Sequence, residues 1–129
     1  MMYKKLILGL TALLLIFGCS SNTPQPSQSV RHIIMWTLND SIQGAERTQL
    51  IQEACADFYR LKPLIPGIIS MEVVYEGRLP SSNCDFMFDI VLESEEALKN
   101  FTEHPEHLKN AGKLKPFIQS RTCLDVLIP

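Results

Sequence analysis

The feature that most constrains the fold of this chain is an apolar run near its N-terminus. Residues 6–17 are almost continuously hydrophobic, and Lys4 and Lys5 precede them. The run is too short to cross a bilayer as a stable helix, which needs about 20 residues. A positively charged start, a short apolar stretch and then small residues are typical of a secretory signal peptide. We therefore expect residues 1–18 to be removed and the fold to come from the rest of the chain.

A cysteine follows the apolar run at the expected cleavage point. The segment LIFGCSS, in which Gly18 stands directly before Cys19, resembles the bacterial lipobox, where a small residue precedes the cysteine that receives lipid. The resemblance predicts a lipoprotein held on a membrane by several acyl chains, such as palmitate, because a single chain binds only marginally. An aspartate directly after the lipidated cysteine would resemble a signal for retention in the inner membrane. Ser20 stands there instead, so in a double-membraned bacterium we expect the outer membrane, on its periplasmic face. The alternative is an uncleaved anchor helix with an incidental cysteine.

The chain after the cleavage point divides into a tether and one domain. Residues 20–29 read SSNTPQPSQS and have almost nothing to bury, so Cys19 and this stretch form an expected flexible tether over 19–29. Residues 30–129 are enough for a single domain. The chain without residues 1–18 has 10 basic and 14 acidic residues, a net charge of −4. This balance argues against nucleic acid as a partner, because nucleic acid requires a basic face.

Three cysteines remain once Cys19 is set aside, namely Cys55, Cys84 and Cys123. An odd number cannot pair completely within one chain, and no CxxC spacing supports a metal finger. Cys55 lies on the apolar face of a predicted helix, which favours a small core residue. A bridge between Cys84 and Cys123 stays open as an alternative in an oxidising compartment.

Four segments of the domain are predicted as strands, because they are rich in β-forming residues and alternate with period two. They are residues 30–38, 68–75, 85–93 and 120–128. In the first strand this period places His32, Ile34 and Trp36 on one face. In the third strand Asp85 and Asp89 interleave with apolar residues, and we expect both carboxylates to solvate one side of the strand.

Two helical regions lie between these strands. Residues 45–62 carry one apolar stripe at helical spacing, made of Ile51, Ala54, Cys55, Phe58 and Leu61. The second region is expected to start at Ser94 as N-cap, break near His104, and restart with Pro105 in its first turn. The resulting order is β-α-β-β-α-β.

This order predicts an α+β fold built on the ferredoxin-like split βαβ unit. Helices can cover only one face of a four-stranded sheet. The other face still offers large apolar residues, and a second copy of the chain is expected to bury it. The sequence therefore predicts a homodimer.

Several short segments together resemble the family of stress-responsive dimeric A/B barrel (Dabb) domains. They are RHIIMW at 31–36, IPGI at 65–68, Cys84-Asp85, HPEH at 104–107 and CLD at 123–125. The resemblance spans residues 30–127. It implies two ferredoxin-like units whose sheets close into a dimeric α/β barrel with the helices outside. It does not imply a single activity, because one fold hosts many functions.

The same resemblance suggests site residues. In a plant member that is a polyketide cyclase, the second histidine of HPxH is the base and an aspartate of the closing strand hydrogen-bonds to it. These roles would fall on His107 and Asp125, and His32 and Phe101 would line the same pocket. The cyclase has a tyrosine where this chain has Phe101, and phenylalanine cannot donate a hydrogen bond to an oxyanion.

Plainer roles for the three histidines stay open. His104 before Pro105 fits a helix cap, His107 with Asp125 fits a buried structural pair, and His32 fits a satisfied core histidine. No metal site is expected, because His104 and His107 at i, i+3 lack a third ligand.

Two function classes follow. The first is a stress-related module that binds a small apolar molecule in the barrel. The second is a small cofactor-independent enzyme (a cyclase, isomerase or lyase) in which His107 is the general base. No cofactor is expected in either case.

Overall fold

The computed structural model describes residues 26–129. The expected signal peptide (1–18) and the expected lipidation site, Cys19, lie outside the described residues. Within residues 26–129 no helix is long and apolar enough to cross a membrane.

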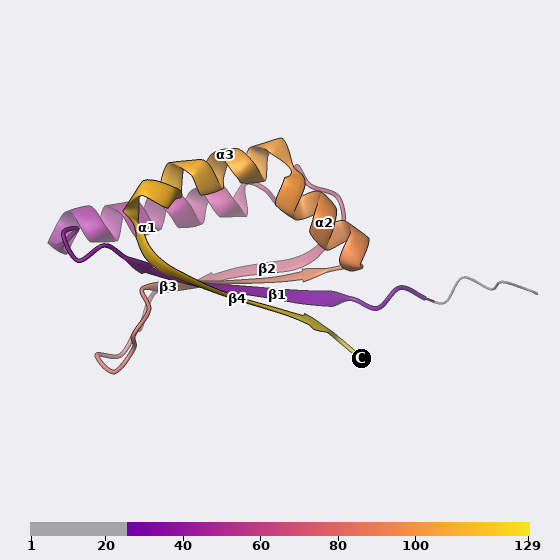
Figure 1. Ribbon diagram of the computed structural model, residues 1–129, viewed down its shortest axis with the longest axis horizontal. Helices are drawn as coiled ribbons and strands as arrows, with labels where there is room; N and C mark the ends of the chain where they lie inside the picture. The colour runs from indigo at the N-terminus through magenta and orange to yellow at the C-terminus, as the bar shows by residue number, and fades with distance from the viewer. Residues whose placement is uncertain (1–25) are drawn as a thin grey trace, which may run out of the picture.

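The described chain forms one four-stranded sheet with all of its helices on one face (Figure 1). The elements are β1 (Val30–Leu38), α1 (Gly44–Tyr59), β2 (Ile68–Val74), β3 (Phe86–Leu92), α2 (Glu95–Glu103), α3 (Pro105–Leu114), a 3-10 turn η1 (Lys115–Phe117) and β4 (Ile118–Leu127). The predicted β-α-β-β-α-β order is confirmed, with the second helical region split in two. The fold is ferredoxin-like.

The sheet order is β2-β3-β1-β4, and all neighbouring strands are antiparallel. The central strand β1 is therefore hydrogen-bonded on both sides. In this register His32 lies opposite Ile90 of β3 and Asp125 of β4. The backbone N–H of Ile128 donates to the carbonyl of Ser29 at 2.8 Å, which continues the pairing of β1 and β4 beyond both strands.

The core lies between the helices and the sheet. Along β1, every second residue from Val30 to Leu38 is buried, as the alternation predicts. Aromatic rings fill the centre: Trp36 stacks on Phe86 at 4.8 Å between ring centroids, and Phe58 of α1 packs on Phe88 at 4.7 Å. Cys55 is 4% exposed, so its prediction as a core residue is confirmed.

Local signals position the helices as predicted. Ser94 caps α2, because its Oγ accepts from the N–H of Ala97 at 3.0 Å. His104 separates α2 from α3 and caps the latter, its Nδ1 accepting from the N–H of Glu106 at 3.2 Å. The helix-cap role for His104 is confirmed.

A glycine explains the IPGI segment. Gly67 has φ +87°, a conformation that side-chain-bearing residues rarely adopt, and a Cβ there would lie 2.8 Å from Cβ of Ala97. Only glycine therefore lets the chain enter β2 this close to α2.

The expectation that Asp85 is solvated was wrong. Asp85 is 3% exposed. Its carboxylate accepts from the backbone N–H of Leu38 at 2.7 Å, from Arg47 at 2.5 Å and from Arg78 at 3.1 Å. Asp89 lies on the uncovered face and pairs with Arg31 at 2.7 Å. Asp85 can be buried because two arginines from other segments and the backbone N–H of Leu38 all hydrogen-bond to its carboxylate.

The face of the sheet away from the helices is covered by no described element. Met35, Val74, Leu124 and Val126 are exposed apolar residues of its strands. Cys55, Cys84 and Cys123 are all free thiols, so the described residues contain no Cys84–Cys123 bridge.

Candidate functional site

A cavity of about 410 Å³ lies between α3 and the sheet. Most of its wall is apolar, and the larger apolar side chains are Ile34, Trp36, Phe58, Phe88, Leu108 and Leu114. Its polar groups are few: His32, His107, Arg121 and Lys115. Largely apolar walls with a few polar groups that converge are typical of small-molecule pockets.

His107, in α3, lines this cavity. Its Nδ1 lies 3.1 Å from the carbonyl oxygen of Thr102. Because a carbonyl only accepts, Nδ1 carries the proton and Nε2 is the unprotonated nitrogen of the neutral ring. Burial lowers the pKa of His107 below its ordinary value of 6.5, and the charges of His32, Arg121 and His104 act in the same direction. His107 is therefore a neutral imidazole at pH 7 with a defined tautomer.

Phe101 packs against both histidines and is not among the residues that line the cavity. It is fully buried, with its ring centroid 4.5 Å from that of His107 and 6.0 Å from that of His32. Phe101 supports both rings by packing. It does not line the pocket as the resemblance suggested.

Asp125 pairs with His32 and not with His107. Its Oδ1 lies 2.5 Å from Nδ1 of His32. The hydrogen bond predicted between His107 and Asp125 does not form, and the Thr102 carbonyl takes the place of the carboxylate. The register explains the outcome, because Asp125 of β4 stands directly opposite His32 of β1. The catalytic role assigned to His107 and Asp125 stays a prediction.

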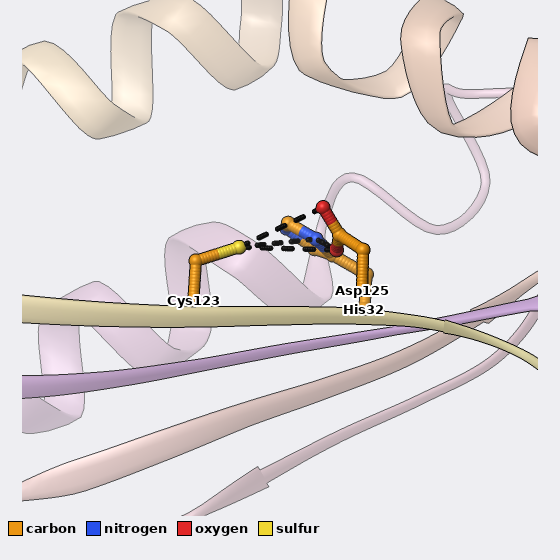
Figure 2. Close-up of side chains that lie close together, drawn as sticks. All are labelled: His32, Cys123 and Asp125. Carbon is orange, nitrogen blue, oxygen red and sulfur yellow. Dashed lines mark hydrogen bonds and ion pairs between the residues drawn. The ribbon is translucent and has the colours of Figure 1, made fainter.

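Cys123 joins this pair on the helix-facing side of the sheet (Figure 2). Its Sγ lies 3.9 Å from Nδ1 of His32 and 3.8 Å from both carboxylate oxygens of Asp125. Burial, then the Asp125 charge, raises the pKa of the Cys123 thiol above its ordinary value, against the opposing charge of Arg121. The sulfur is therefore a neutral thiol at pH 7 and a poor nucleophile.

The comparison with protein-family models now identifies the fold family. Residues 30–128 match the stress responsive A/B barrel domain, Dabb. The chain belongs to the Dabb family. A search of the curated proteins gives no match.

Solved structures agree with this Dabb assignment at the level of the fold. A dimeric ferredoxin-like protein of unknown function from Bacteroides fragilis has a TM-score of 0.73 and 22% identity, over 78% of this chain and 96% of its own. A Dabb family protein from Mesorhizobium loti has a TM-score of 0.63 and 18% identity, over 80% and 98%. The hydroxynitrile lyase of Passiflora edulis has a TM-score of 0.66 and 17% identity, over 81% and 96%.

Two site residues of this Dabb domain were missed at the sequence level. Arg121 lines the cavity, and Cys123 completes the cluster with His32 and Asp125. The sequence contains a pattern that could have identified both residues. Arg121, Cys123 and Asp125 are spaced two apart along one predicted strand, so their side chains must lie on the same face of the sheet.

Proposed function

We propose that this protein is a membrane-anchored lipoprotein whose Dabb domain binds a small, largely apolar molecule in the cavity beneath α3. The cavity carries the proposal, because its apolar wall supplies the binding surface. Arg121 and His107 offer the ligand hydrogen-bonding groups at that wall. The preferred ligand is therefore an apolar body that bears a carbonyl or acidic oxygen.

Trp36 provides a direct assay of binding. It lines the cavity and is the single tryptophan of the chain. Titration with small aromatic and aliphatic ketones should give a saturable change in its fluorescence emission. No saturable change across such a panel would contradict the proposal.

A cavity-filling variant makes the assay specific. Gly112 lines the cavity, and a Cβ added there meets nothing within 4 Å. Gly112→Leu should fill the space without disturbing α3, since leucine also favours a helix over glycine. We expect ligand affinity to fall at least about tenfold, the loss of roughly 1.4 kcal/mol of contact. Lys109→Leu adds the same side chain at an exposed position of α3 and should bind like the wild type.

The second candidate is a cofactor-independent enzyme in which His107 abstracts a proton next to a carbonyl. The neutral ring of His107, with Nε2 unprotonated and the residue at the cavity wall, favours it. Arg121 would stabilise the developing enolate oxygen. One similar structure is named a hydroxynitrile lyase, so this fold accommodates an enzyme.

Hydrogen–deuterium exchange separates the two candidates. An enolisable ligand that binds in the cavity should exchange its α-protons in D₂O, measured by NMR, only if His107 acts as a base. His107→Ala should then abolish exchange while the Trp36 emission still reports binding. Exchange that survives His107→Ala would rule out His107 as the base.

Homodimerisation is part of the proposal. The exposed apolar residues of the uncovered sheet face support it, as does the dimeric description of the similar Bacteroides fragilis protein. Light scattering on residues 26–129 should give twice the chain mass. Leu124→Glu, which places a charge on that face, should give the monomer. A folded wild-type monomer at micromolar concentration would count against a dimer.

The membrane anchor rests on the LIFGCSS segment. Cys19→Ala should release the protein from the membrane pellet into the soluble fraction, and persistence in the pellet would contradict lipidation. Separation of inner and outer membranes tests the expected outer-membrane, periplasmic location.

A further inference from the structure

Three metal-ligating side chains converge on the helix-facing side of the sheet, at His32, Cys123 and Asp125 (Figure 2). Cys123 and Asp125 are two residues apart on β4, so both point to the same face. His32 on β1 stands opposite Asp125 in the register. The backbone of two paired strands thus fixes the three side chains as neighbours.

The spacing of the donor atoms is close to that of a tetrahedral zinc site. The zinc–ligand bond lengths of thiolate, imidazole and carboxylate place sulfur about 3.6 Å from nitrogen or oxygen, and nitrogen about 3.4 Å from oxygen. Here Sγ of Cys123 lies 3.9 Å from Nδ1 of His32 and 3.8 Å from the Asp125 oxygens. Only the 2.5 Å separation of Nδ1 and Oδ1 must open. The Asp125 side chain is 45% exposed and has room to turn.

Within residues 26–129, Asp125 itself has no lysine or arginine as a partner. Its ion pair there is with His32, while the charge of Arg121 acts on the neighbouring Cys123 thiol. Its partner His32 is a side chain that also ligates metals, 5% exposed and fixed in place by the sheet. A dication at this point would pair with the carboxylate and bind the imidazole and the sulfur at once.

We propose that His32 Nδ1, Cys123 Sγ and an Asp125 carboxylate oxygen bind Zn²⁺. Thiolate and imidazole favour zinc over the hard cations Mg²⁺ and Ca²⁺. On binding, the thiol proton of Cys123 passes to solvent. The proton between His32 Nδ1 and Asp125 leaves Nδ1, and the neutral ring that binds the metal carries its single proton on Nε2. Three protein ligands leave a fourth position for water or for an oxygen of a ligand, the arrangement of catalytic zinc sites. His32 also lines the cavity, so the ion would lie at the cavity's edge.

Cobalt reports the site directly, because tetrahedral Co²⁺ with a thiolate ligand gives intense visible bands and a near-ultraviolet sulfur-to-metal band. The full-length protein, kept reduced in detergent, should show both at one equivalent of Co²⁺. One equivalent of Zn²⁺ should remove them. Cys123→Ser should lose the sulfur band, while Cys84→Ser, the matched change at the other partly accessible cysteine, should keep it.

The remaining ligands are tested by affinity. His32→Gln and Asp125→Asn should each weaken Zn²⁺ binding at least about tenfold, since even loss of a supporting residue costs that much. Circular dichroism and Trp36 emission should confirm that the variants are folded. A Co²⁺ spectrum without a sulfur band, a band kept in Cys123→Ser or a band lost in Cys84→Ser would overturn the proposal. Ligand binding by Trp36 emission in metal-free protein tests the cavity separately.

Discussion

A carboxylate lies beside each end of strand β1, and the two carboxylates differ in how completely they are paired. At the Leu38 end, Asp85 is 3% exposed and accepts from two arginines and a backbone amide. At the His32 end, the Asp125 side chain is 45% exposed and pairs with one imidazole beside a free thiol. The first cluster is complete as it stands. The second retains unused donor atoms beside a cavity, which is the arrangement of a binding site.

The largest effect is expected at the complete cluster. Asp85→Asn removes the negative charge that faces Arg47 and Arg78. Breaking a buried pair by removing one partner costs about 3–5 kcal/mol. Urea denaturation should show a loss of that size in the free energy of unfolding. Glu106→Gln, at a half-exposed side chain that pairs with Lys109 on α3, is the control and should lose less than about 1 kcal/mol. Equal losses would show that burial of Asp85 is not what distinguishes it.

A smaller effect is expected at the cavity histidine. His107→Ala leaves the Thr102 carbonyl without its donor and removes a ring that packs on Phe101. The free energy of unfolding should fall by about 1–3 kcal/mol. A thermal melt measures this against wild type. A larger loss, comparable to that of Asp85→Asn, would make His107 a structural residue and weaken the catalytic candidate.

The cavity histidine also predicts a pH dependence. Burial lowers the pKa of His107 below 6.5 in the folded protein. The unfolded chain therefore takes up a proton first as pH falls, and the stability contributed by the neutral ring is present above pH 6.5 and lost below it. One proton gives a slope of at most about 1.4 kcal/mol per pH unit. Urea denaturation from pH 7 to pH 5 should show a shallower loss in His107→Gln than in wild type. Identical slopes would contradict the inferred neutral ring.

The smallest effect is expected at the incomplete cluster. Asp125→Asn keeps an oxygen that can accept from His32, at a half-exposed position. In the metal-free protein the free energy of unfolding should change by less than about 1 kcal/mol. Chemical denaturation in the presence of a chelator is the measurement. A loss as large as that of Asp85→Asn would erase the contrast between the two ends of β1.

Most of the fold could be predicted because its signals are local. The alternation in β1, the apolar stripe of α1 and the Ser94 cap each lie within a few residues, and all three predictions were confirmed. The errors fell on side chains whose partners lie far away in the sequence. Asp85 is buried because its partners come from other segments of the chain, among them Arg47 of α1 and the backbone N–H of Leu38.

The candidate site shows the same division. The sequence pointed to His107, His32 and Asp125, but the way in which they pair depends on strand register. A one-residue shift of β4 would remove Asp125 from the face it shares with His32. From the resemblance to a cyclase we expected Asp125 to hydrogen-bond to His107. In the structure it bonds to His32, because the strand register places these two residues opposite each other.

The central place of β1 also has a mechanical consequence. Any pull on the chain before Val30 acts along a strand that is bonded to β3 on one side and β4 on the other. Antiparallel hydrogen bonds run perpendicular to the strands, so such a force shears both ladders at once and does not open them one bond at a time. The domain therefore resists tension applied at the N-terminal end of Val30 with a strand that is hydrogen-bonded on both sides.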